Sequence, residues 1–172
     1  MKKIYFVIPC IALVVAGCMS SSEPQGPQAN AWEQYKAWFK VTPEPNTGDP
    51  TGFLGNVHEG LNAYRDIYVN AAGRDVNQGV SPFPYPEGSI LVKETFRNLA
   101  TYNTQQNPDL TVMVKLAKGS SPETSDWEYV MGADGLNRGT GTSGVAVFCH
   151  SCHTAAAATD FNFINTEFLS SH

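Results

Sequence analysis

The stretch VFCHSCHTAAAATDFNF, residues 147–163, concentrates side chains with metal and redox chemistry in one short segment. Its core is the pentapeptide Cys149-His150-Ser151-Cys152-His153. Two thiols and an imidazole in this order can ligate a metal ion, close a redox disulfide or hold a haem. Each alternative requires its own cellular compartment and its own surrounding fold, and the rest of the sequence discriminates among them.

The N-terminal segment predicts an exported lipoprotein. Two lysines precede an apolar run over residues 4–16, which is short for a membrane span and typical of a secretory signal. The run ends in Ala16-Gly17-Cys18, which resembles a bacterial lipobox, although an ordinary signal peptide with a chance cysteine is the alternative. Met19 stands where an inner-membrane retention signal has Asp. We therefore expect removal of residues 1–17, acylation of Cys18 and anchoring at the outer membrane, on its periplasmic side.

The remainder of the chain predicts one tethered domain. Residues 18–30 combine the lipidated cysteine with a segment rich in Ser, Pro, Gly and Gln, which is typical of a flexible tether. Residues 31–172 have the length of a single domain. The net charge of −5 becomes more negative when the signal lysines are lost, and no basic patch is visible. Nucleic acid is therefore not an expected partner, and the membrane is contacted through the lipid alone.

Cysteine usage narrows the chemistry of the cluster. After processing and acylation, only Cys149 and Cys152 remain as thiols in the domain. A structural zinc site takes more ligands than this cluster offers, and a thioredoxin-like motif would follow a strand in a βαβ unit. Cys-x-x-Cys-His in an exported protein is instead typical of covalent haem c attachment, with a disulfide or adventitious metal as the alternatives. On a helix, which alanines 155–158 favour, positions i, i+3 and i+4 share a face. His153 could then reach the iron, whereas His150 is predicted to point elsewhere, as a surface or helix-face residue.

The other elements predict an α+β fold. An amphipathic helix is expected over residues 30–40, capped by Asn30, because its aromatic residues recur at helical spacing. Residues rich in β-branched and aromatic side chains predict strands. Such runs cover residues 63–70, 89–96, 110–118 and 126–132. Because no helical pattern lies between the last three runs, we expect a mostly antiparallel sheet packed with helices.

The strand over residues 89–96 contains a second residue of interest. Alternation places Lys93 in one row with Ser89, Leu91 and Thr95, and places Glu94 in the opposite row. On spacing alone, the simplest interpretation of Lys93 is a solvated strand lysine. Arg65, on the preceding predicted strand, is equally compatible with a surface cation.

Five segments together resemble the cytochrome P460 family: in chain order, YRDIYVN, YPEGSILVKE, DWEYV, CHSCH and TDFNF. The resemblance covers about residues 55–165, nearly the whole predicted domain. It implies a mostly antiparallel sheet packed against helices, with one c-type haem near the C-terminal end. In that family the Cys-x-x-Cys-His motif attaches the haem, which corresponds here to Cys149, Cys152 and His153.

The resemblance also implies roles for Lys93 and Arg65. In catalytic members, a lysine in a Gly-x-x-x-Val-Lys-Glu strand is cross-linked to a meso carbon of the haem, and Lys93 matches it. An arginine lies on the distal side, and Arg65 matches it, so both would be catalytic residues. The family usually has Asp-x-Val-Phe after the haem motif, and Asn162 replaces the valine here. Related proteins called cytochrome c′-β share the fold, lack the cross-link and bind gases such as nitric oxide.

Two functions follow from these expectations. The first is a haem oxidoreductase that oxidises hydroxylamine to nitrogen oxides and passes electrons to a redox protein such as a soluble cytochrome; the presence of Lys93 favours it. The alternative is a non-catalytic c-type cytochrome that carries electrons or binds nitric oxide. Met113, Met131 and His58 are rival sixth ligands of the iron, although both methionines are predicted to pack in the core. A homodimer is a further open alternative.

Overall fold

The computed structural model describes residues 31–42, 46–47, 64–132 and 134–163. The expected signal segment 1–17, the tether 18–30 with Cys18, and His58 lie outside the described residues. No helix in the described ranges combines the length and the apolar character that crossing a membrane requires.

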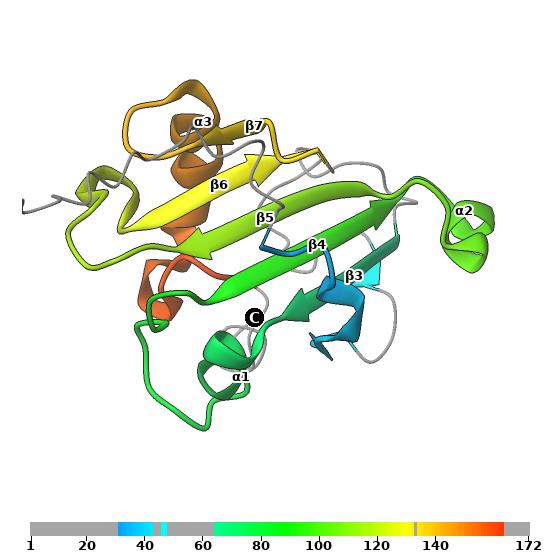
Figure 1. Ribbon diagram of the computed structural model, residues 1–172, viewed down its shortest axis with the longest axis horizontal. Helices are drawn as coiled ribbons and strands as arrows, with labels where there is room; N and C mark the ends of the chain where they lie inside the picture. The colour runs from blue at the N-terminus through cyan, green and yellow to red at the C-terminus, as the bar shows by residue number, and fades with distance from the viewer. Residues whose placement is uncertain (1–30, 43–45, 48–63, 133, 164–172) are drawn as a thin grey trace, which may run out of the picture.

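An antiparallel sheet organises the described residues (Figure 1). Its strands lie in the order β1-β3-β4-β5-β6-β7, and β2 also pairs with β3. All of the pairings are antiparallel. The four strands expected from the sequence correspond to β3 to β6, so the mostly antiparallel α+β fold is confirmed. The strand bounds are β1 Phe39–Lys40, β2 Asn46–Thr47, β3 Tyr64–Val69, β4 Ile90–Phe96, β5 Asp109–Lys115, β6 Trp127–Met131 and β7 Asn137–Gly139.

Short helices connect and cover the strands. The α-helices are α1 Ala71–Asn77, α2 Leu99–Thr104 and α3 Gly144–His153, and the 3₁₀ helices are η1 Tyr35–Ala37, η2 Pro122–Thr124 and η3 Thr154–Thr159. Helix α3 confirms the helix predicted through the cysteine cluster, but it ends at His153, and alanines 155–158 lie in the 3₁₀ helix η3 instead. The sequence analysis did not predict α1 and α2, whose starting signals are local. Asn70 accepts a hydrogen bond from the Gly73 N–H, and Asn98 forms a reciprocal capping box with Thr101.

The amphipathic helix expected over residues 30–40 is wrong. Only the single 3₁₀ turn η1 forms there, and the backbone is extended at Trp38, with ψ of 177°. Phe39 and Lys40 then pair with Val69 and Tyr68 on β3. The ladder with β3 satisfies the backbone groups that a longer helix would have satisfied internally. The proposed cap, Asn30, lies outside the described residues.

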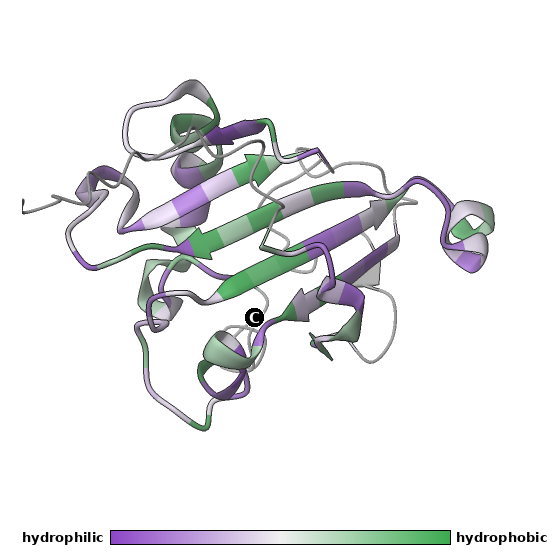
Figure 2. Ribbon diagram, viewed as in Figure 1, coloured by the Kyte–Doolittle hydropathy of each residue, from purple (hydrophilic) through white to green (hydrophobic). Residues whose placement is uncertain are grey.

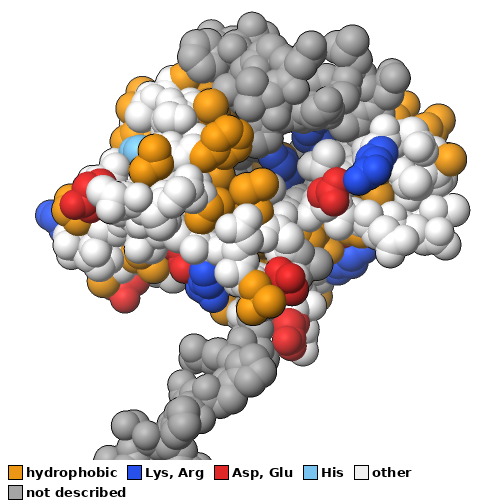
Figure 3. Space-filling model, turned by 90° about the horizontal axis from the view of Figure 1, so that it is seen from above, with side chains coloured by type: hydrophobic (Ala, Val, Ile, Leu, Met, Phe, Trp, Pro, Cys, Tyr) orange, Lys and Arg blue, Asp and Glu red, His pale blue; other side chains and the backbone are white. Residues whose placement is uncertain are grey.

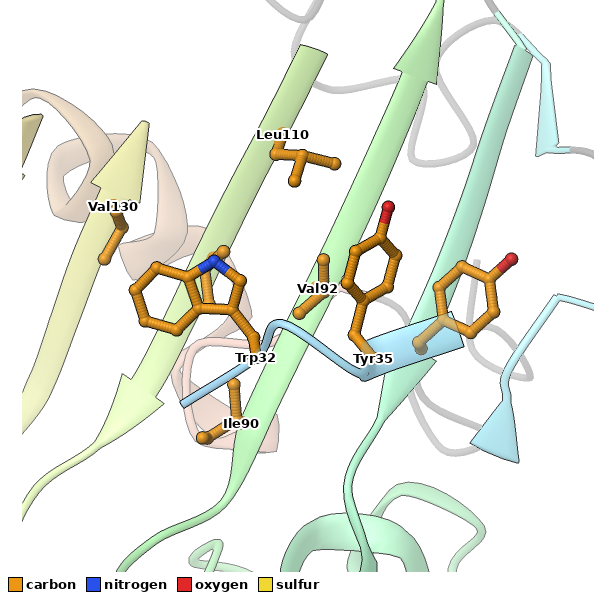
Figure 4. Close-up of a cluster of buried hydrophobic side chains, with 8 residues drawn as sticks. Trp32, Tyr35, Ile90, Val92, Leu110 and Val130 are labelled. Atoms are coloured by element: carbon orange, nitrogen blue, oxygen red, sulfur yellow. The ribbon is translucent and has the colours of Figure 1, made fainter. Parts of the chain in front are cut away.

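One face of the sheet, called here the η1 face, is closed by the N-terminal segment. Trp32 and Tyr35 lie across the central strands, and the Tyr35 ring meets Tyr68 edge to face at 5.3 Å between centroids. Figure 4 shows this cluster, in which each strand from β3 to β6 contributes an apolar side chain. The buried members are Trp32, Tyr35, Tyr68, Ile90, Val92, Leu110, Val112 and Val130.

The opposite face, called here the α3 face, is covered by α1 and α3. Its buried residues are Val69, Val76, Tyr85, Leu91, Trp127, Tyr129 and Ala146. Helix α3 approaches β7 closely because Gly139 has no side chain: a Cβ there would come within 1.8 Å of the Ser143 Oγ. Figure 2 shows β3 and β4 changing from hydrophobic to hydrophilic along their length. The hydrophilic stretches adjoin, since Arg65 pairs with Thr95 and Asp66 with Glu94.

Candidate functional site

Helix α3 presents the cysteine cluster beside the sheet. Ala146, Cys149 and His153 recur at the three-and-four spacing that defines one helix face, and Ala146 is completely buried. Cys149 packs at the margin of the α3-face core. Cys149 and Cys152 are both free thiols and half-buried. Burial raises the pKa of the Cys149 thiol, and the neighbouring Lys93 opposes that shift. Both sulfur atoms are therefore held, unpaired with one another, on the helix that contacts β6 and β7.

His153 lies in a setting that suits a metal-ligating imidazole. Its Nδ1 is 2.6 Å from the Phe161 carbonyl oxygen, and a carbonyl can only accept, so Nδ1 carries the proton. The other ring nitrogen, Nε2, then keeps its lone pair. Burial is the main cause that lowers the His153 pKa to about 4, so the ring is neutral at pH 7. A neutral ring with one tautomer fixed by a carbonyl is the state in which histidine binds metals.

Of the two positions predicted for His150, surface or helix face, the structure supports the helix face of α3. It is half-buried, and its Nδ1 lies 3.0 Å from the Tyr129 hydroxyl. Its ring also packs against Phe161, with centroids 4.7 Å apart. The Tyr129 ring, from β6, contacts both His150 and His153. The sequence analysis missed Tyr129, and only the packing of β6 against α3 reveals it.

Lys93 projects from β4 on the α3 face. It pairs with Ile67 and Thr111 on the flanking strands, and it is half-buried rather than solvated. Burial is the largest cause that lowers its pKa to about 8, followed by the positive charge of Arg65, while Cys149 acts in the opposite direction. His153 also feels the charge of Lys93. The structure thus brings Lys93 near the cysteine and histidine of α3.

Arg65 joins the same face from β3. It pairs with Thr95, so it occupies the row of Ile67 and lies diagonal to Lys93 on the neighbouring strand. Only 5% of its surface is exposed, so the interpretation of Arg65 as a surface cation is wrong. Burial of a guanidinium beside an amine is electrostatically unfavourable, and such an arrangement is characteristic of functional sites more than of plain sheet surface.

The two methionines behave differently. Met113 is partly buried on the α3 face and packs against its core, as expected. Met131 is 37% exposed, so its predicted core position is wrong. It lies at the end of β6, where the sheet has only short β7 beyond it. The third rival ligand, His58, lies outside the described residues.

The segment after α3 accommodates the unusual Asn162. This side chain is buried, and its amide donates to the Tyr85 hydroxyl at 3.1 Å. Asn77 donates to the same oxygen at 3.2 Å. Asn162 stands where the sequence comparison expects valine, and the Tyr85 hydroxyl gives its buried amide a hydrogen-bond partner. Neither Tyr85 nor Asn77 was identified from the sequence.

These residues fit a covalently attached haem. Two free thiols, a neutral imidazole and an apolar cluster adjoin a row of half-buried side chains on β4 and β5. Among the described residues, no group of three or more His, Cys, Asp or Glu side chains is arranged to hold a metal ion. Haem iron needs no such group, because the macrocycle supplies most of its ligands. Figure 3 shows hydrophobic side chains gathered beside a hollow in the surface, within which cationic side chains are visible.

A protein-family model matches most of the domain. The family model described as Cytochrome P460 matches residues 32–164. No curated protein matches the sequence. The matched range includes the sheet, helix α3 and the segment that contacts His153.

Proposed function

The chain belongs to the cytochrome P460 family and is therefore a c-type cytochrome, and from this premise we propose that it oxidises hydroxylamine to nitrogen oxides. The electrons pass one at a time to a redox protein such as a soluble cytochrome. The observation that carries this proposal is the position of Lys93, on the sheet face that α3 covers and with a pKa lowered to about 8.

Cys149, Cys152 and His153 hold the cofactor in this proposal. The thiols would form the thioether bonds to one haem c, and the spacing on α3 would let His153 reach the iron. When bound, the haem supplies an iron that changes oxidation state by one electron and has a coordination position for a small molecule. The contact between the His153 Nδ1 and Phe161 leaves Nε2 as the ligand atom.

Lys93 would supply the second link to the haem, through its Nζ to a meso carbon. A lysine attacks only as the neutral amine, and the lowered pKa makes that form accessible near neutral pH. The new bond replaces one N–H and one C–H, so two protons and two electrons leave. A small-molecule oxidant of the peroxide class accepts them. The link would distort the macrocycle, which is one means by which a protein alters haem iron.

Arg65 orients the substrate. Its guanidinium is buried on the same face as Lys93, and a buried guanidinium donates strong hydrogen bonds to oxygen. Directed at the oxygen of a bound N–O group, it would hold hydroxylamine with its nitrogen toward the iron. It would also stabilise negative charge that develops on that oxygen.

Export completes the proposal. The sequence 1–17 directs the chain across the inner membrane, and Cys18 is acylated and anchors the domain by lipid at the periplasmic side of the outer membrane. The tether then leaves the domain free to meet diffusible substrates and redox proteins.

Hydroxylamine oxidation tests this proposal, followed with an artificial electron acceptor. Lys93→Ala and Lys93→Arg should both lose the activity sharply while keeping the haem and its one-electron reduction, because the thioethers are untouched and arginine stays protonated. Lys118→Ala is the matched control, since Lys118 is exposed beyond β5. If the wild-type protein binds nitric oxide or exchanges electrons but never oxidises hydroxylamine, it is the non-catalytic cytochrome instead.

A further inference from the structure

The turn that follows η3 has an unusual backbone. Asp160 and Phe161 both have positive φ, 51° and 64°. Asp tolerates this left-handed region because its side chain can bond locally, whereas a bulky residue such as Phe is disfavoured there. Two consecutive residues of this kind persist only where surrounding contacts impose the conformation, and such sites are frequently functional.

Contacts from three other parts of the chain fix Asp160. Its carboxylate accepts from the Lys115 Nζ at 2.8 Å and from the Tyr85 N–H at 2.8 Å. Its carbonyl accepts from the Trp127 indole N–H at 3.0 Å. Asp160 is 8% exposed and Trp127 is completely buried. Both the side chain and the backbone carbonyl of Asp160 are therefore held in place by hydrogen bonds.

Lys115, like Asp160, is buried and is held by several contacts. Only 8% of its surface is exposed. Its Nζ also donates to the Ser125 carbonyl at 3.0 Å and lies 4.7 Å from the centre of the Trp127 ring. A buried pair with several additional hydrogen bonds has a defined geometry.

The next carbonyl in the chain belongs to Phe161, and it is the oxygen that contacts the His153 Nδ1 at 2.6 Å. Because the Lys115–Asp160 pair fixes the turn, it also fixes where this oxygen points. The strength of such a hydrogen bond governs how strongly an imidazole donates electrons to a metal.

We propose that Lys115 and Asp160 are positioning residues for the iron ligand: their buried ion pair holds the Phe161 carbonyl against the His153 Nδ1, and so sets the electron-donor strength of that imidazole. This inference rests on the assignment of His153 as the axial ligand in the proposed function. The alternative is that the ion pair only anchors the segment after η3. Anchoring alone does not require a buried ion pair, because apolar residues in its place often stabilise a fold equally well.

The test uses the haem-loaded protein with Asp160→Asn and Lys115→Met. The readouts are the iron–imidazole stretching frequency of the reduced protein, by resonance Raman spectroscopy, and the reduction potential. Both variants should lower the frequency and raise the potential, because a weaker hydrogen bond makes the imidazole a poorer donor to ferric iron. Glu128→Gln is the matched control: it removes the partner of Arg138, a pair joined at 2.6 Å between β6 and β7, and it should leave both quantities at the wild-type values.

An unchanged frequency and potential in the two variants, with only a lower free energy of unfolding, would overturn the inference and leave the pair as an anchor. If Asp160→Asn yields too little folded protein, Lys115→Met decides the question from the other partner. A wild-type protein without an iron–imidazole band overturns the inference together with the ligation by His153. Absence of hydroxylamine oxidation with an intact band and the predicted shifts overturns the proposed activity alone.

Discussion

Lys93 and Glu94 are consecutive residues that face opposite sides of the same sheet, and their surroundings differ sharply. Glu94 is completely buried on the η1 face, where it accepts a hydrogen bond from the Tyr35 hydroxyl and pairs with the Lys36 Nζ at 3.0 Å. Lys93 is half-buried on the α3 face, near a second cation, Arg65.

The two faces therefore follow different rules. On the η1 face the buried acids have cationic partners, since Lys40 also pairs with Asp66 at 2.9 Å, and the aromatic cluster is closed. On the α3 face, Arg65 is buried and Lys93 is half-buried on the neighbouring strand, and burial together with the charge of Arg65 lowers the Lys93 pKa, an arrangement typical of functional sites. The η1 face supports the fold, and the α3 face is the one that we propose holds the cofactor.

Removing both thiols should give the largest difference between the faces. In Cys149→Ala/Cys152→Ala, the thioether bonds cannot form, so all haem attached through α3 should be lost, and only haem joined through Lys93 could stay on the polypeptide. Acid–organic extraction followed by absorption of the polypeptide measures it. Haem that stays covalently bound to this variant must be attached through another residue. The fraction of polypeptide that keeps haem therefore measures how much of the protein carries the Lys93 link.

Truncating the aromatic cluster should affect stability and leave the haem chemistry intact. Trp32 is 3% exposed on the η1 face, and Trp32→Ala should lower the free energy of unfolding by about 3–5 kcal/mol. Denaturant titration measures this change. Val80→Ala is the control, because Val80 is 73% exposed and its change should stay within about 0.5 kcal/mol. A loss of haem attachment in folded Trp32→Ala would contradict the separation of the two faces.

Removing the charge of Lys93 should have the smallest of the three effects, a change in the free energy of unfolding that depends on pH. Its pKa is lowered from 10.5 to about 8 in the folded chain, so between these values the unfolded chain binds more protons and stability rises with pH. In the haem-free Cys149→Ala/Cys152→Ala background, Lys93→Met should therefore add about 1–3 kcal/mol at pH 7. The gain should disappear as the pH rises through that interval.

Denaturant titrations at several pH values check this, with Lys118→Met as the exposed counterpart. A pH-independent gain for Lys93→Met would mean that its amine is not desolvated.

The sequence predicted what local patterns determine. Strands β3 to β6 followed from alternation and residue type, and helix α3 from the spacing of the cysteine motif, whereas alanines 155–158 form the 3₁₀ helix η3 and not the expected α-helix. The helix over residues 30–40 failed because pairing with β3 is a tertiary contact that overrides helical spacing. The burial of Arg65 depends on what covers its strand, which no periodicity reports. Lys115 and Asp160 are 45 residues apart, and only the folded chain brings them together.

Peptide mapping of the purified protein by mass spectrometry shows whether Lys93 is bonded to the haem. If it is, one haem is joined to two peptides, one with Cys149 and Cys152 and the other with Lys93. The absorption spectrum should then differ from that of an ordinary c-type haem and revert to it in Lys93→Ala. An unmodified Lys93 peptide, together with a plain c-type spectrum of the wild-type protein, would contradict the account and make Lys93 a bystander.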